Sequence, residues 1–200
     1  IHAEKGATII NGFNKSLTKE EYLKHLNQKK ITEVLNTIPM EANDAILIPA
    51  GRVHAIGPGN FLAEIQQTSD ITYRIYDWER VDNHNNPRRL HTEEALDAID
   101  FSMTKETKIS YKTTLNKTEN ITKCNYFSVN VLQFDQTLEK VYVGIDSFVV
   151  YMVVEGAFAL HCEEQTEMLK IGDTILIPAS IEEITLEPII PSKVLEIFIP

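Results

Sequence analysis

A repeated segment constrains the fold of this chain more than any other feature of its sequence. Residues 43–54 align without a gap on residues 172–183, and both copies contain the pattern Asp-x-Ile-Leu-Ile-Pro-Ala. Each copy predicts a turn, a buried strand, a proline that ends the strand, and a tight turn into the next strand. Because a whole supersecondary unit recurs at domain distance, we expect two similar β-domains. The first copy can present the imidazole of His54, where the second copy has Glu183.

Short apolar runs, bounded by Gly, Pro, Asn or Asp, dominate the rest of the chain. They are rich in β-branched and aromatic residues, which favour strands. Many short strands separated by turns predict a sandwich or a barrel. The predicted strands are residues 45–48, 61–65, 71–76, 127–132, 148–154, 174–177 and 194–199.

Two segments have helical spacing instead. Apolar residues recur every three or four positions over about residues 17–38, which predicts two short helices that end before Pro39. Thr18 followed by Glu21 is typical of a capping box at the start of the first helix. A third helix is predicted over about residues 93–99, with Thr92 as its N-cap.

The chain is expected to divide near the polar segment Lys105-Glu106-Thr107-Lys108. Strands and helices precede this segment, and almost only strands follow it. We therefore predict a first domain over residues 1–104, with a helical insertion at about 17–38, and a second domain over residues 105–200.

Charge and composition exclude several classes of function. The 19 Lys and Arg residues are outnumbered by 29 Asp and Glu residues, which gives a formal charge of −10. This balance argues against a nucleic acid or an anionic membrane as partner. No run reaches the roughly 18 apolar residues of a membrane-spanning helix. The two cysteines, Cys124 and Cys162, are too few for a disulfide scaffold, and as reduced thiols they fit a cytoplasmic protein.

Residues 43–54 also carry the second cupin motif, Gly/Asn-x5-Pro-x-Gly-x2-His. The longer runs at residues 48–57 and 62–78, the sequence Arg-Arg-Leu-His at 88–91, and the opening at residues 6–13 closely resemble type I mannose-6-phosphate isomerases of the short bacterial form. The resemblance covers residues 1–100 strongly and residues 101–200 mainly by architecture.

This resemblance implies a mostly β fold of two cupin domains, which are β-barrels of the jelly-roll type. The first barrel would be incomplete, would carry the helical insertion, and would hold one zinc ion with His54 as a ligand. The second would be free of metal, in keeping with Glu183. The implied reaction interconverts mannose 6-phosphate and fructose 6-phosphate, so that the partner is a small sugar phosphate, and the implied assembly is a monomer or a homodimer.

The sequence departs from the family pattern at its start. The family's first metal motif supplies a His or Gln pair and a Glu upstream of the segment that matches Ile1, so the other zinc ligands are expected upstream of Ile1. We therefore interpret the chain as a fragment of a larger isomerase and leave open whether it is active alone. A barrel without its first strands would expose unpaired strand edges.

Among the residues themselves, Arg74 lies in an otherwise apolar segment. Taken alone, it could pair with Glu64, Asp70 or Asp77, but the resemblance implies a catalytic role. A fixed guanidinium can stabilise the negative charge that develops on oxygen in an enediolate.

The isomerisation also needs a general base, for which Asp70 is the first candidate and turn capping is its alternative role. Glu64 is a second candidate carboxylate, which we assign to substrate binding. Four arginines are possible phosphate contacts, with plain surface solvation as the alternative: Arg52, Arg80, Arg88 and Arg89.

Two other functions remain open from the sequence. The chain could be a non-catalytic cupin module that binds a sugar or regulates transcription, or a metal-dependent cupin with another chemistry, such as an epimerase or a dioxygenase.

Overall fold

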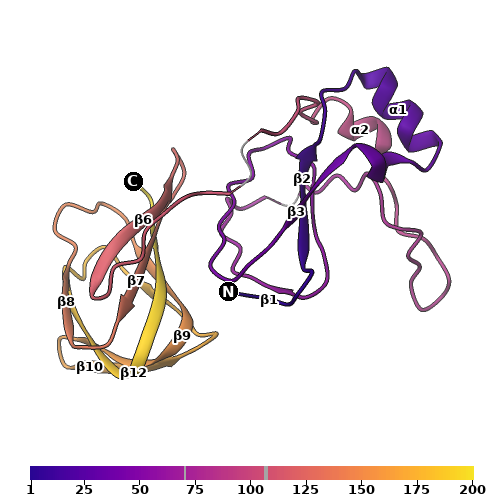
Figure 1. The fold of residues 1–200 in the computed structure, drawn as a ribbon. Coiled ribbons are helices and arrows are strands. Elements are labelled where there is room, and N and C mark those ends of the chain that lie inside the picture. Colours follow the sequence, from indigo (N-terminus) through magenta and orange to yellow (C-terminus); the bar gives the residue numbers. More distant parts are fainter. Residues whose placement is uncertain (70, 106–107) are drawn as a thin grey trace. The chain divides into compact units, whose positions relative to one another are not determined.

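The computed structural model describes residues 1–69, 71–105 and 108–200, and the chain forms two compact units, Ile1–Lys108 and Ile109–Pro200 (Figure 1). The predicted mostly β fold is confirmed, with 41% of residues in strands and 9% in helices. Within the described ranges, no helix has the length and the apolar composition needed to cross a bilayer.

The first unit is built on a three-stranded antiparallel sheet. Strand β2 (Thr8–Phe13) lies between β3 (Leu35–Pro39) and β4 (His54–Ile56). A separate pair joins β1 (His2–Ala3) to β5 (Asn60–Phe61). The strands are short, so this unit depends strongly on its helices and loops for a core.

Helix α1 (Lys19–Asn27) begins at the capping box that the sequence predicts. The Thr18 hydroxyl accepts from the amide of Glu21 at 3.2 Å, and the Glu21 carboxylate accepts from the amide of Thr18 at 2.8 Å. These two bonds satisfy amides that the first turn would otherwise leave unpaired. The helix buries Tyr22 against Phe101, with ring centroids 5.3 Å apart, and so contributes to the core of the first unit.

The other two predicted helices are largely wrong. Only a 3₁₀ turn, η1 (Ile31–Val34), follows α1, and residues 35–39 form β3 because β2 offers them a hydrogen-bonded partner. The third helix is reduced to α2 (Thr92–Ala95), and its N-cap is His91 rather than Thr92. At residues 35–39, pairing with β2 overrode the helical preference that the local spacing indicates.

Three predicted strands are also wrong. Residues 45–48 and 71–76 form no regular strand in the described part of the chain, and residues 61–65 contribute only Phe61 to β5. Apolar side chains that a paired sheet would bury are exposed there, with 41% of Leu47 and 67% of Ile71 accessible. A strand needs a neighbour for its backbone groups, and the described residues of this unit supply none for these segments.

The second unit is a larger antiparallel sheet. Its order is β10-β9-β12-β7-β6, with β11 paired to β9 and β8 paired to β12. The strands are β6 (Lys117–Lys123), β7 (Ser128–Phe134), β8 (Leu138–Val141), β9 (Val149–Cys162), β10 (Gln165–Lys170), β11 (Thr174–Ile177) and β12 (Glu183–Phe198).

The long strands β9 and β12 pair with each other and change their outer neighbours along their length. Gly156, at φ +85°, lies where β9 passes from β11 to β10. Bulges on β12 between Pro188 and Val194 accompany the bend, as bulges commonly do where a sheet curves. Two bent strands shared by several partners produce a cupin-like sheet.

A charged network lies inside the second unit. Glu196 is 3% exposed. It accepts hydrogen bonds from the hydroxyls of Tyr142 and Tyr151, at 3.0 and 3.1 Å, and from the side-chain Nδ2 of Asn130 at 3.1 Å. Lys140 forms an ion pair with it at 2.9 Å. Burial raises the pKa of Glu196, but the Lys140 charge and the hydrogen bonds outweigh burial and leave that pKa lowered. The buried carboxylate is therefore held ionised by its partners.

Candidate functional site

His54 begins β4, directly after the tight turn of the repeated segment. The turn is closed by a hydrogen bond from the amide of Arg52 to the carbonyl of Pro49 at 3.1 Å. Gly51 has φ +81°, and a Cβ atom there would lie 2.5 Å from the carbonyl oxygen of Ala98, so the turn requires glycine. The local sequence thus sets the position at which the imidazole leaves the backbone.

The two ring nitrogens of His54 have different roles. Nδ1 lies 3.0 Å from the carbonyl oxygen of Arg52. A carbonyl only accepts, so in the neutral ring Nδ1 carries the proton and donates, which leaves the lone pair on Nε2. His54 is exposed, and Nε2 is therefore the nitrogen that can bind a metal ion.

Asn11 lies directly opposite His54 on β2, so the two side chains share one face of the sheet. Asn11 is 0% exposed, and neither its Oδ1 nor its Nδ2 has a hydrogen-bond partner among the described residues. An unpaired buried amide is costly, and sequence reasoning did not single it out.

These groups do not make a complete zinc site. The described part of the chain contains no cluster of three or more His, Cys, Asp or Glu side chains able to hold a metal ion. Zinc takes four ligands, or three protein ligands and a water. His54 fits the role of one ligand, and the described residues do not bring the other ligands to it.

Arg74 lies outside regular strands and is held by residues 89–91. Its amide donates to Nδ1 of His91 at 3.0 Å, and its carbonyl accepts from the amide of His91 at 2.8 Å. Its guanidinium donates from Nη1 to the carbonyl of Arg89 at 3.4 Å, and the side chain is half-buried. The role of His91 as the partner of Arg74 has no signal in the sequence.

The remaining predicted site residues are not brought together with these. Glu64 is exposed, and no hydrogen bond or ion pair within the described ranges joins His54, Glu64 and Arg74. Asp70 lies outside the described residues.

Asp77, one of three possible partners for Arg74, binds two other arginines instead. It is 6% exposed and forms ion pairs with Arg80, at 2.6 Å, and with Arg88. Hydrogen bonds from Arg88, and then from Arg80, outweigh desolvation and lower the pKa of Asp77 to about 2. Two of the four arginines proposed as phosphate contacts are thus organised by one carboxylate.

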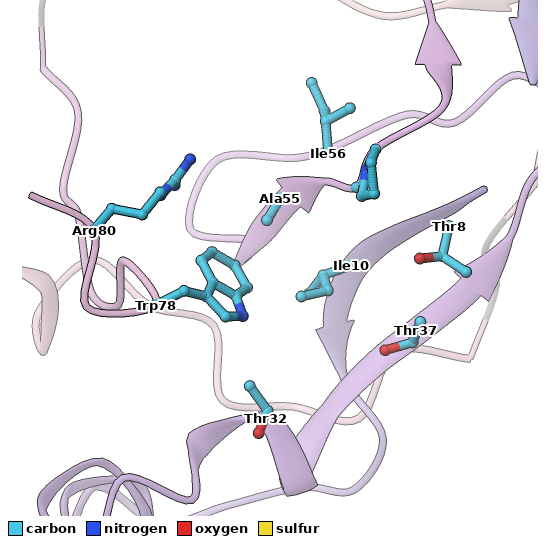
Figure 2. A pocket seen from close by; sticks show the side chains of 10 residues that line it. Thr8, Ile10, Thr32, Thr37, Ala55, Ile56, Trp78 and Arg80 are labelled. Carbon is cyan, nitrogen blue, oxygen red and sulfur yellow. The ribbon is translucent and has the colours of Figure 1, made fainter. Parts of the chain in front are cut away.

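The first unit contains a cavity of about 480 Å³ beside the three-stranded sheet (Figure 2). Its wall includes Thr8, Ile10, Thr37 and Ala55 from the sheet. Figure 2 shows the indole of Trp78 facing Ala55 and Ile10.

The second unit has a cavity of about 580 Å³, lined mainly by apolar residues of β9, β10 and β11. His161 lies on β9, where both of its ring nitrogens are engaged: Nδ1 with the Thr166 hydroxyl at 2.9 Å, and Nε2 with Glu187 at 3.0 Å. Neither nitrogen is left with a lone pair directed at open space.

Comparisons with known proteins agree on the relationship. Residues 116–190 match the family model described as "Mannose-6-phosphate isomerase, cupin domain". The mannose-6-phosphate isomerase ManA of Bacillus subtilis is 31% identical over 191 residues, which is 94% of this chain and 59% of that protein. The mannose-6-phosphate isomerase of Streptococcus mutans is 39% identical over 99 residues, which is 50% of this chain and 31% of that protein.

The crystal structure of the mannose 6-phosphate isomerase from Bacillus subtilis superposes with a TM-score of 0.88 at 28% identity, over 98% of this chain and 62% of that one. The resemblance inferred from the sequence is confirmed. The chain spans about 59% of the length of the curated Bacillus relative.

Proposed function

We propose that this relative of the cupin-type mannose-6-phosphate isomerases interconverts mannose 6-phosphate and fructose 6-phosphate. The observation that carries the proposal is the arrangement at His54, whose Nδ1 is fixed by a carbonyl while Nε2 stays available, in a chain 31% identical to a named isomerase. The substrate is a small sugar phosphate.

His54 would supply one ligand to a zinc ion through Nε2, and the other ligands are expected from residues upstream of Ile1. Zinc, when bound, acts as a Lewis acid that polarises the hydroxyl and carbonyl oxygens of the sugar. Borderline nitrogen ligands such as imidazole suit zinc well.

Arg74 would stabilise the enediolate. Isomerisation removes a proton from C2 of the aldose and returns one to C1, and negative charge gathers on the neighbouring oxygens between the two transfers. The backbone of Arg74 is held by His91 and its guanidinium by the carbonyl of Arg89, so the guanidinium offers donors to that charge without reorganising. Asp70 is the proposed base for the proton transfer, and Glu64 the proposed partner of a sugar hydroxyl.

The two units would be two cupin domains. We assign residues 1–104 to the C-terminal part of a catalytic cupin domain, with a helical insertion at about 17–38, and residues 105–200 to a second, metal-free cupin domain. The chain would then be a fragment of a larger isomerase that works as a monomer or homodimer. Cys124 and Cys162 are both free, which supports a cytoplasmic location.

The test is a coupled assay for fructose 6-phosphate formation by the full-length parent protein and by its Arg74→Gln variant, with zinc measured by elemental analysis. We expect kcat to fall about 100-fold or more in Arg74→Gln, with zinc content unchanged. Lys15→Gln is the matched control, because Lys15 is an exposed cation of the same unit and is not among the candidate site residues. Wild-type turnover by Arg74→Gln would refute the role of this arginine.

A second variant tests the metal ligand. His54→Ala removes Nε2 and should lower the bound zinc per chain to background, whereas Arg74→Gln should not. Unchanged zinc content in His54→Ala would exclude the imidazole as a ligand.

One observation favours a second candidate function, a non-catalytic module that binds a sugar or regulates another process. The described residues supply no cluster of three metal ligands. This alternative predicts saturable binding of mannose 6-phosphate by calorimetry with no turnover at any zinc concentration.

A further inference from the structure

The cavity of the first unit is lined by Ile10 and Ala55 of the sheet and also by Ile56 at the end of β4. In register, Ile10 pairs with Ala55, while Asn11 pairs with His54. Successive side chains of a strand point to opposite faces, so the pair that lines the cavity and the pair that includes His54 face away from each other. His54 is not among the residues that line the cavity, so the cavity is separate from the imidazole of the proposed isomerase site.

Its walls combine apolar surface with free hydroxyl groups. Trp78 is 46% exposed, and its indole faces the aliphatic side chains of the sheet (Figure 2). The hydroxyls of Thr8, Thr32 and Thr37 make no hydrogen bond to any described residue. A slot between an indole and an aliphatic wall suits a flat ring, and the hydroxyls suit a ligand with several polar groups.

One edge of the cavity carries positive charge. Arg80 lies 5.7 Å from the Trp78 ring and directs its Nε and Nη2 to Oδ1 of Asp77. Asp77 also neutralises Arg88, so two guanidinium groups share one carboxylate and leave net positive charge. Since 62% of the Arg80 side chain is exposed, it remains open to a phosphate.

The segment that presents these two side chains has an unusual backbone. Trp78 and Glu79 have φ values of 50° and 56°, a left-handed conformation that residues with a Cβ atom rarely adopt. The ion pairs of Asp77 on one side and of Glu79 with Lys29 on the other hold it in place. Strained backbone that is tied down in this way tends to occur at binding sites.

We propose that this cavity binds a nucleoside monophosphate, with the base stacked on Trp78, the ribose hydroxyls near the threonines and the phosphate on Arg80. Stacking of a base on an aromatic side chain is favourable for any base, and a guanidinium recognises phosphate by paired hydrogen bonds. The volume of about 480 Å³ lies within the range of small-molecule sites. The site uses neither His54, Glu64 nor Arg74, and it assigns Arg80 to this ligand rather than to the sugar phosphate. Its test needs neither zinc nor turnover.

Trp78 is the single tryptophan of the chain, so its fluorescence reports on this cavity alone. We would titrate the protein with AMP, adenosine, ribose 5-phosphate and inorganic phosphate. The expected result is saturable quenching by AMP, with adenosine and ribose 5-phosphate each at least about tenfold weaker, because each lacks one of the two anchors. No saturable response to AMP, or equal affinity for ribose 5-phosphate, would overturn the proposal.

Two variants and a control sharpen the test. Arg80→Gln should reduce the affinity for AMP to that for adenosine. Thr32→Val leaves Asp77 and its partners intact and should lower the affinity for AMP several-fold. Thr113→Val is the matched control, since Thr113 is exposed in the second unit and does not line the cavity. Circular dichroism verifies folding. Wild-type affinity for AMP in both Arg80→Gln and Thr32→Val would reject the site.

Discussion

At the scale of single residues, the chemical role of a side chain depends on its hydrogen-bond partners as well as on its residue type. His54 could be recognised in the sequence, but the direction of its free nitrogen depends on the Arg52 carbonyl. Asp77 is one acidic residue among 29 Asp and Glu residues in the sequence, and only the folded chain makes it the shared partner of Arg80 and Arg88. These two ion pairs hold the segment that carries Trp78, and they lower the pKa of Asp77 to about 2.

Asp77→Asn should destabilise the first unit in a pH-dependent manner. The pKa of Asp77 is lowered from 3.8 to about 2 by folding, so its stabilising effect is complete above about pH 4 and is lost as the pH falls towards 2. Urea unfolding followed by Trp78 fluorescence should give a lower midpoint for Asp77→Asn at pH 6 and nearly equal midpoints near pH 2. Asp146→Asn, at an exposed aspartate, is the control; a difference independent of pH would contradict this reasoning.

At the scale of elements, local signals hold where the stabilising contacts are local. The start of α1 follows from Thr18 and Glu21, which are three residues apart and satisfy each other. Residues 35–39 and 71–76 show the opposite case. The first segment becomes β3 because β2 is beside it, and the second stays irregular because no described strand pairs with it.

Gly156→Ala should destabilise the second unit more than a surface change does. A Cβ atom there would lie 2.4 Å from both the Pro191 carbonyl oxygen and the Ser192 hydroxyl, at a positive φ. We expect a loss of about 2 kcal/mol or more in unfolding free energy, from left-handed strain plus the clash with backbone.

Gly144→Ala is the matched control for this position. Gly144 has φ +92° but no atom within 4 Å of a built Cβ, so only the conformational strain of about 1 kcal/mol applies. Urea unfolding measures the loss of unfolding free energy in both variants. Equal losses would show that the close approach of β12 at Gly156 does not contribute to the destabilisation.

At the scale of the whole molecule, each unit has a core of its own. Phe13, Tyr22 and Ile31 belong to the first, and Phe134 and Tyr151 to the second, with no member in common. Separate cores predict separate cooperative transitions, because each unit buries its own apolar surface.

Unfolding should therefore be seen at different urea concentrations by different probes. Trp78 fluorescence reports on the first unit, while far-ultraviolet circular dichroism is dominated by the strand-rich second unit. Gly156→Ala should lower the midpoint seen by circular dichroism and leave the Trp78 midpoint unchanged. A parallel shift of both probes would mean that the chain unfolds as one cooperative body.

The sequence by itself determined the class of fold, the start of α1 and the turn that places His54. The start of α1 and this turn depend mainly on residues close together in the chain. Tertiary structure alone decided which apolar segments became strands, which arginines Asp77 holds, and that the cavity beside Trp78 does not include His54. These outcomes depend on which distant segments come to lie side by side, since a strand or an ion pair exists only when its partner is present.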